Sequence, residues 1–287
     1  MSIYRANLFA STTAVVTGGG TGIGKAIAKE LLGLGGRVVL ASRNAERLAA
    51  AVAELQLHAA AGKDAVSSFT CNIRDEAAVK ELIATVIRTY GGIYGLVNNA
   101  GGQYPSTISN LSLKGWEAVI RNNLTGGFIV AREAYTQWME AHGGSIVNII
   151  ADIWGGMPTM AHTGAARAGM LNFTETVACE WAQSGVRVNA VAPGWIASSG
   201  FDTYDEAMQA ELRQLKNKVP LGRYGNEAEV SAAIVFLLSP GAAFINGSSI
   251  RVDGGVPNAR HTWKPVPTNR STPFDGFPLA TVPRCLQ

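Results

Sequence analysis

The chain has 287 residues, of which 47% are hydrophobic and 16% charged, and it carries a formal net charge of +3 with a pI near 8.8. This much apolar material supplies a buried core and excludes wholesale disorder. The mild positive charge suits an anionic small molecule. It falls short of the clustered basic surface of nucleic-acid-binding proteins, so we expect no nucleic-acid partner.

No segment reaches the roughly 18 apolar residues that cross a bilayer, and the first residues lack the pattern of a signal peptide. We therefore expect a cytoplasmic protein without a membrane partner. The three cysteines, Cys71, Cys179 and Cys285, lie far apart without metal-type spacing. They are expected to be inert thiols, and no metal site is predicted.

Short β-branched runs alternate along the chain with longer amphipathic stretches, a pattern typical of a parallel sheet with crossover helices. Strands are predicted at 13–17, 37–41, 65–70, 95–98, 145–150, 186–191 and 248–252. Helices are predicted at 22–34, 45–61, 76–90, 113–140, 162–183 and 227–239. The predicted fold class is α/β, a single domain with a doubly wound, seven-stranded parallel sheet covered by helices on both faces. Ligands of such sheets bind beyond the carboxyl ends of the strands.

The composition changes near the end of the chain. Prolines stand at 257, 265, 267, 273, 278 and 283, and no apolar periodicity accompanies them. We expect one domain over residues 1–256, including a substrate lid at about 195–218, and a proline-rich tail over 257–287. The tail is either an unpacked end or a segment that wraps a neighbouring subunit or the substrate entrance.

A glycine-rich loop follows the first predicted strand. Val15-Val16-Thr17 leads into Gly18-Gly19-Gly20-Thr21-Gly22-Ile23-Gly24 and then directly into a helix. Glycines let the backbone approach a pyrophosphate, and the helix N-terminus presents free N–H groups to it. The strand–loop–helix context predicts a Rossmann-type dinucleotide site, contacted by Gly18, Thr21, Gly22 and Ile23.

The end of the second strand indicates which dinucleotide binds. Enzymes that use NAD place an acidic residue there for the ribose 2′-hydroxyl. This chain has Ser42 and Arg43 instead, with Arg47 one helical turn further on. A guanidinium pairs well with a 2′-phosphate, which favours NADPH as the cofactor. The alternative is that these are solvated charges at a helix start.

Further motifs resemble the short-chain dehydrogenase/reductase family over roughly residues 10–256. They are Asn98-Asn99-Ala100-Gly101, Asn123, the run 187–194 (Arg-Val-Asn-Ala-Val-Ala-Pro-Gly) and Val252-Asp253-Gly254-Gly255. The resemblance implies an oxidoreductase. It also implies further cofactor contacts at Asn72, Ile73, Asn99, Ala100, Gly101, Arg167, Pro193, Gly194 and Ile196.

The catalytic positions of that family are altered here. The family serine is replaced by Ala151 (or Ile150), and its Tyr-x-x-x-Lys motif reads Thr163-Gly164-Ala165-Ala166-Arg167. Thr163 and Arg167 keep one helical face, but a threonine hydroxyl is far too weak an acid to replace an activated tyrosine. Either the protein is a dehydrogenase that has lost activity and binds NADP(H) as a sensor or scaffold, or its reaction needs no tyrosinate.

Reduction of an α,β-unsaturated thioester meets the second condition, because hydrogen-bond donors can stabilise the enolate oxygen. The run 162–169 (His-Thr-Gly-Ala-Ala-Arg-Ala-Gly) is similar to the peroxisomal-type trans-2-enoyl-CoA reductases and their neighbours, the 2,4-dienoyl-CoA reductases. This resemblance implies NADPH-dependent reduction of a 2-enoyl-CoA, with Asn123, Thr163 and Arg167 as catalytic residues. A carbonyl reductase or alcohol dehydrogenase with a displaced proton donor is the alternative.

Other residues have weaker assignments. Tyr104 is a candidate donor or a surface aromatic, and His162 is expected to be a cap or core residue rather than the proton source. Phe201, Tyr204 and Met208 are expected to form an apolar lid over an acyl chain or to pack on the domain. The aromatics of helices 113–140 and 162–183 are expected to form subunit contacts in a homotetramer, or else core contacts within one chain.

Overall fold

The computed structural model describes residues 2–203, 205–259, 268, 270–274 and 282–287. Its centre is a seven-stranded, all-parallel sheet in the order β3-β2-β1-β4-β5-β6-β7. The strands are β1 (Thr13–Thr17), β2 (Arg37–Ser42), β3 (Val66–Thr70), β4 (Gly95–Asn98), β5 (Gly144–Ile149), β6 (Val186–Pro193) and β7 (Ser249–Val252). The predicted fold class is confirmed, and every predicted strand lies within two residues of its observed bounds.

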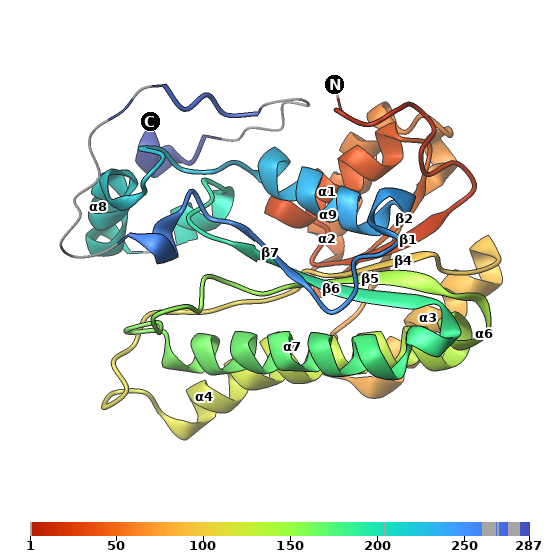
Figure 1. The fold of residues 1–287 in the computed structure, drawn as a ribbon, viewed down its shortest axis with the longest axis horizontal. Helices are drawn as coiled ribbons and strands as arrows, with labels where there is room; N and C mark the ends of the chain where they lie inside the picture. The colour runs from red at the N-terminus through yellow and green to blue at the C-terminus, as the bar shows by residue number, and fades with distance from the viewer. Residues whose placement is uncertain (1, 204, 260–267, 269, 275–281) are drawn as a thin grey trace.

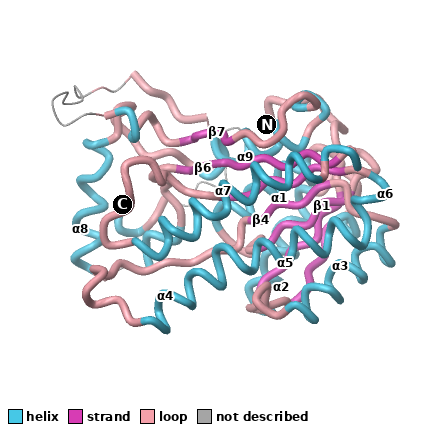
Figure 2. Tube along the Cα trace, turned by 60° about the horizontal axis from the view of Figure 1, so that its bottom comes forward, coloured by secondary structure: helices cyan, strands magenta, loops and turns pink. Residues whose placement is uncertain are grey.

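Helices cover both faces of the sheet, as Figures 1 and 2 show. The helices α1, α2 and α9 contribute to one apolar core with β1 and β2. The helices α3, α5 and α7 contribute to a second core on the opposite face. The bounds are α1 (Gly22–Gly33), α2 (Ala45–Leu55), α3 (Glu76–Tyr90), α4 (Leu113–Ile120), α5 (Gly126–Ala134), α6 (Glu140–His142), α7 (Ala161–Glu180), α8 (Glu206–Leu215) and α9 (Glu227–Leu238).

The strand order explains where a ligand binds. Sequence order runs outward in opposite directions from β1 and β4, which pair in parallel at the middle of the sheet. The loops that follow these two strands leave on opposite faces, so a crevice opens between them at the carboxyl edge. The glycine-rich loop follows β1 and therefore lies in this crevice.

The predicted helix at 113–140 is observed with two interruptions. The π turns Arg121–Thr125 and Tyr135–Met139 separate α4, α5 and α6. Close packing accompanies the first turn, since a Cβ atom at Gly126 would lie 2.7 Å from the Ile73 side chain and one at Gly127 would lie 2.5 Å from Met170. π turns occur often at functional sites. Here the first one carries Asn123.

Two other segments differ from the expectation. The second predicted helix ends at Leu55 rather than at residue 61, because a 3₁₀ turn at Gln56–His58 follows it. The expected lid contains a helix, α8, after a 3₁₀ turn at Ser199–Thr203. Phe201 is buried and Met208 packs beside it, whereas Tyr204 lies outside the described residues.

Candidate functional site

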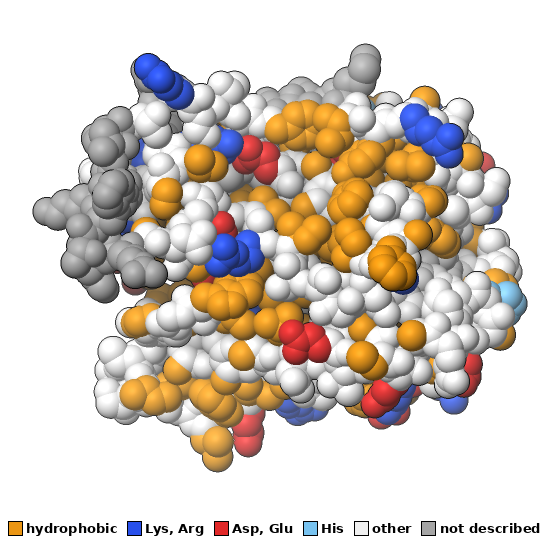
Figure 3. All heavy atoms as spheres, viewed as in Figure 1, with side chains coloured by type: hydrophobic (Ala, Val, Ile, Leu, Met, Phe, Trp, Pro, Cys, Tyr) orange, Lys and Arg blue, Asp and Glu red, His pale blue; other side chains and the backbone are white. Residues whose placement is uncertain are grey.

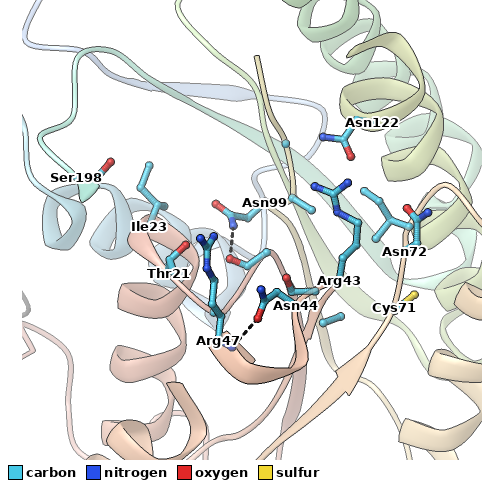
Figure 4. Close-up of a pocket in the computed structure, with 17 residues that line it drawn as sticks. Thr21, Ile23, Arg43, Asn44, Arg47, Cys71, Asn72, Asn99, Asn122 and Ser198 are labelled. Atoms are coloured by element: carbon cyan, nitrogen blue, oxygen red, sulfur yellow. Dashed lines mark hydrogen bonds between the residues drawn. The ribbon is translucent and has the colours of Figure 1, made fainter. Parts of the chain in front are cut away.

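A cleft of about 650 Å³ opens at the carboxyl edge of the sheet, where the structure places the crevice between β1 and β4. Figure 4 shows its lining side chains, which come from the ends of β1, β2, β3 and β4 and from the loop after β6. Of the predicted cofactor residues, Gly18, Thr21, Ile23, Ser42, Arg43, Arg47, Asn72, Ile73, Asn99, Ala100 and Gly101 line this cleft.

The remaining predicted cofactor residues lie outside that lining. Gly22 begins α1, Pro193 ends β6, and Ile196 is buried and bridges to Gly225. Gly194 follows β6, and Arg167 lies on α7. Their contact with a cofactor remains a prediction.

Sequence reasoning missed three polar lining residues. These are Asn44, the N-cap of α2, Asn122, in the first π turn, and Ser198, in the loop after β6. None of them follows directly on a strand, so the strand-end rule does not find them. The pattern that could have found Asn122 is its place beside Asn123, and for Ser198 it is the run of small residues at 197–200 (Ala-Ser-Ser-Gly).

The hydroxyl group of Thr17 helps to hold the glycine loop in place. Thr17 Oγ1 accepts hydrogen bonds from the backbone N–H groups of Asn99 and Ala100, both at 3.0 Å, and donates to Val97 O at 3.3 Å. Asn99 Nδ2 donates back to Thr17 O at 2.9 Å. The loop after β1 and the loop after β4 are thereby joined across the cleft.

Glycine is required at the closest points of this loop. A Cβ atom at Gly24 would lie 2.5 Å from Gly18 O and 2.6 Å from Asn99 Nδ2, and Gly18 has a φ of +67°. The backbone therefore turns within contact distance of the cleft, with the N-terminus of α1 behind it. This cradle fits the pyrophosphate of a dinucleotide.

Two arginines stand at the β2 side of the cleft. Figure 4 shows Arg43 extending toward Asn72 and Asn122, while Arg47 extends beside Thr21. Asn44 caps α2 between them by accepting a 2.8 Å hydrogen bond from Arg47 N. The cap fixes the turn that carries both guanidinium groups, so positive charge gathers at the β2 side of the cleft.

Arg167 links the ends of β4 and β5. Its Nη1 donates a 2.6 Å hydrogen bond to Ile149 O, and its Nη2 lies so near Gly101 that a Cβ atom there would overlap it. Burial lowers the pKa of the guanidinium to about 10, so it stays charged at neutral pH. Among the described residues it forms no ion pair. An enclosed cation without a carboxylate partner is well suited to a negatively charged ligand.

Asn123 and Thr163, the other predicted catalytic residues, are both buried. The Asn123 amide accepts a 2.9 Å bond from Gly102 N and donates a 3.0 Å bond to Gly102 O. These bonds tie the loop after β4 to the π turn, which is a structural role. Thr163 occupies the first turn of α7 at 1% exposure. Catalytic roles for both residues remain predictions.

His162, beside Thr163, is fully buried. Its Nδ1 accepts a 2.8 Å hydrogen bond from Thr163 N, so the neutral ring carries its hydrogen on Nε2. Nε2 has no hydrogen-bond partner among the described residues. The ring meets Tyr104 edge-on at 5.0 Å, and Tyr104 itself is 42% exposed. Two potential donors thus lie at the N-terminus of α7.

Two carboxyl groups flank the end of β6. Asp152 follows β5 and Asp253 follows β7, and each has one buried oxygen without a hydrogen-bond partner among the described residues. Arg251 Nε lies 3.5 Å from the Asp253 oxygen. Burial first, and then the charge of Asp253, raises the pKa of Asp152. A carboxyl group that keeps its proton to higher pH is therefore available at this edge.

The glycine cradle, the hydrogen-bonded ends of β1 and β4 and the partly buried cation of Arg167 form a Rossmann-type cleft of the kind in which oxidoreductases bind a nicotinamide dinucleotide. Residues 18–257 match the family model described as enoyl-(acyl carrier protein) reductase, and the chain belongs to the short-chain dehydrogenase/reductase family. No helix in the described part of the chain is long and apolar enough to cross a membrane.

Relatives with assigned names fall into more than one group. The chain is 37% identical over 245 residues to a probable 2,4-dienoyl-CoA reductase of Bacillus subtilis (strain 168), covering 84% of this chain and 94% of that protein. It is 34% identical over 257 residues to a peroxisomal 2,4-dienoyl-CoA reductase of Danio rerio, covering 88% and 84%. Further matches are named 3-oxoacyl-(acyl-carrier-protein) reductase.

Among solved structures, the citronellol catabolism dehydrogenase of Pseudomonas aeruginosa PAO1 is 54% identical to this chain, with a TM-score of 0.79. The match covers 89% of this chain and 99% of that one. The similarity therefore spans the whole of the dehydrogenase domain.

Proposed function

We propose that the protein reduces the α,β double bond of a 2-enoyl-CoA thioester with NADPH. The names of the dienoyl-CoA reductases support acyl-CoA chemistry. The family also contains ketone-forming and ketone-reducing enzymes, so the choice depends on the site itself.

The observation that carries the proposal is the pair Thr163 and Arg167. Where a ketone reductase of this family has a tyrosine, this chain has a buried alcohol, and where the family has an amine it has a guanidinium that forms no ion pair within the described part of the chain. Ketone reduction needs a proton delivered to an alkoxide oxygen. Reduction of an enoyl thioester needs negative charge stabilised on an oxygen, which a fixed cation and neutral donors provide.

The chain's own groups have distinct parts in this chemistry. Bound NADPH supplies the hydride. The charge of Arg167 is held beside Gly101 and Ile149, where it favours an enolate-like oxygen and the ribose hydroxyls of the cofactor. His162 Nε2–H and the Thr163 hydroxyl are neutral donors to that oxygen. Asp152, whose pKa is raised by burial and by the charge of Asp253, is a candidate source of the proton for the α-carbon.

The preference for NADPH over NADH is part of the proposal. The β2 end offers Ser42 and Arg43 to the cleft, with Arg47 one turn beyond, and no carboxylate from the β2 end lines it. A planar guanidinium pairs with a phosphate through two parallel hydrogen bonds. A 2′-phosphate therefore adds binding energy at this position, whereas a 2′-hydroxyl does not.

A second candidate function is interconversion of an alcohol and a carbonyl compound. It is favoured by the 54% identity to a protein named a dehydrogenase of citronellol catabolism. In that case Asp152, or Tyr104 on the loop after β4, would replace the missing tyrosine as the acid.

Oxidation of NADPH followed at 340 nm with crotonyl-CoA and longer 2-enoyl-CoAs, against a panel of ketones and aldehydes, separates these candidates. We expect turnover with the enoyl-CoAs, and a saturated acyl-CoA as product by mass spectrometry. Turnover restricted to carbonyl compounds would replace the first candidate by the second. Tight NADPH binding with no turnover of either class would identify a sensor or scaffold.

We also propose a homotetramer. Figure 3 shows apolar side chains gathered over α9 and beside β7, the edge strand of the sheet. Phe244, between these two elements, is fully exposed in the single chain. On the opposite face Trp181 stacks on Tyr135 within the chain, while Leu113 at the start of α4 is 72% exposed. Light scattering after size exclusion, with Phe244→Asp as the disrupting variant, tests the assembly.

A further inference from the structure

The segment that ends the chain lies against the substrate lid. Figures 1 and 2 both place the C-terminal end beside α8. Arg213 Nε, on α8, donates a 2.9 Å hydrogen bond to Cys285 O, and Cys285 N donates a 3.3 Å bond to Asp202 Oδ1. The backbone of one residue is therefore bonded to both helical pieces of the lid.

Apolar contacts accompany these hydrogen bonds. Phe201, Leu212 and Cys285 form a buried cluster of their own, separate from the cores that flank the sheet, and Cys285 is only 5% exposed. Met208, Leu215, Tyr224 and Leu286 pack around it. The lid thus has a small core, and residues of the C-terminal segment complete it.

An earlier part of the same tail is fixed to the start of α9. Arg223 Nε donates a 2.8 Å hydrogen bond to Ser271 Oγ, and Asn226 Nδ2 donates a 2.9 Å bond to Phe274 O. Arg223 also forms a 2.7 Å ion pair with Glu229, which belongs to the capping box of α9. The tail is therefore anchored to the domain before its last residues reach α8.

This tail is an addition to the common domain. The family model ends at residue 257, and 89% of this chain covers 99% of the chain of the Pseudomonas aeruginosa dehydrogenase. The contacts made by Ser271, Phe274 and Cys285 therefore lie beyond the part that the relatives share. We therefore look for a function of these contacts that is specific to this chain.

We propose that the segment Pro283–Gln287 holds the lid closed over the acyl-binding side of the active site, and so sets the affinity for the acyl substrate. A ten-residue helix such as α8 is marginal without tertiary contacts. Its cover is supplied by Cys285 and Leu286. Ser198 lines the cofactor cleft and lies three residues before Phe201. A movement of the lid would therefore displace a residue at the edge of the site.

The size of the effect follows from population arithmetic. If binding needs the closed lid, the apparent KM rises in inverse proportion to the fraction of molecules in that state. Cys285 and Leu286 are positioning residues, since they act through α8. The cofactor cleft is lined mainly by residues that follow β1 to β4, and the lid contributes only Ser198 to this lining. The segment should therefore affect the acyl substrate and leave the dinucleotide almost unaffected.

The test compares the full chain with a variant lacking residues 283–287 and with Cys285→Asp, which places a charge in the lid core. We expect KM for the enoyl-CoA to rise about tenfold in both variants. The Kd of NADPH, followed by its fluorescence, should change less than twofold. Trypsin should cut faster after Lys216 and Lys218, which are exposed at the end of α8. Arg270→Ala is the matched control, because this arginine is exposed and lies in the earlier part of the tail.

The choice of acyl substrate rests on the proposed function, but the protease measurement does not. If the full chain turns over no enoyl-CoA, the proposed function fails while trypsin still reports on the lid. Unchanged cleavage and unchanged KM in Cys285→Asp would overturn the inference. So would an equal loss of NADPH binding in Cys285→Asp, because the segment would then support the whole domain. If the truncated chain does not fold, Cys285→Asp decides alone.

Discussion

The two halves of the active site are built in different ways. The dinucleotide half consists of backbone: Gly18 and Gly24 turn close to the cleft, and Thr17 bonds the ends of two strands. The half that we propose faces the substrate consists of side chains on α7, above all Thr163 and Arg167. The first half keeps its family pattern and the second does not. Backbone geometry tolerates little change, whereas a side chain can be exchanged on the same scaffold to serve another reaction.

The largest expected effect tests the backbone half. In Gly24→Val the added atoms meet Gly18 O and Asn99 Nδ2, so the loop must move away from the pyrophosphate. We expect NADPH binding to weaken at least about a hundredfold, measured by fluorescence titration. Gly33→Ala, in the same helix, is the control, because no atom lies within 4 Å of its Cβ position. Wild-type affinity in Gly24→Val would mean that the dinucleotide does not lie on this loop.

The next effect tests the side-chain half. Arg167→Ala removes the enclosed cation, and we expect kcat/KM for the enoyl-CoA to fall about a hundredfold, with Arg167→Lys retaining part of the rate. Arg187→Ala is the matched control, because this arginine donates a 2.8 Å hydrogen bond to Leu237 O in a structural setting. The control should lower stability and leave the rate of folded protein unchanged. An unaltered rate in Arg167→Ala would remove this residue from the site.

A smaller effect separates the two dinucleotides. Arg43→Ala should weaken NADPH about tenfold and leave NADH nearly unchanged, because only the 2′-phosphate needs the guanidinium. Isothermal titration with both cofactors measures this difference. Arg37→Ala, an exposed arginine at the start of β2, is the control. Equal losses for both cofactors would place Arg43 elsewhere than at the 2′-position.

The last effect concerns the pH dependence of stability rather than ligand binding. Glu227 is 8% exposed, a Cβ atom at Gly22 would lie 3.6 Å from its carboxylate, and burial raises its pKa to about 7 while Lys25 opposes the shift. The pKa of Glu227 is higher in the folded protein than in the unfolded one. Its contribution to the free energy of unfolding is therefore fully present below about pH 4.5 and is lost as the pH rises to about 7. Glu227→Gln should therefore be more stable than wild type at pH 8, by about 2 kcal/mol.

Urea denaturation at pH 5 and pH 8 checks this prediction. The gain from Glu227→Gln should disappear at pH 5, where the wild-type carboxyl group is already neutral. Glu46→Gln, an exposed glutamate in the first turn of α2, is the control and should show no pH-dependent change. A gain of equal size at both pH values would point to packing rather than to the buried charge.

Local patterns in the sequence predicted the parts of the molecule that depend on neighbouring residues. The β-branched runs predicted all the observed strands, and central strands buried on both faces, such as β1, give the clearest apolar run. The glycine loop was predicted because its function requires a particular backbone. Most of the cleft lining follows from the rule that ligands bind at the carboxyl ends of strands.

The rest depends on contacts between residues far apart in the chain. The Asn123 amide is hydrogen-bonded to Gly102, and the Arg167 guanidinium lies against Gly101. Cys285 packs with Leu212 in the lid core. None of these pairs leaves a periodic pattern in the sequence. The π turn at Arg121–Thr125 is also invisible to helix periodicity, because a single wide turn hardly alters the spacing of apolar residues.

The hydrogen bonds of the Thr17 hydroxyl group also affect the rate at which the protein binds its dinucleotide. Because Thr17 Oγ1 bonds the loop after β1 to the loop after β4, the cleft is already formed before the dinucleotide binds. Little ordering entropy remains to be lost on encounter, so association should run as one bimolecular phase without a slow isomerisation.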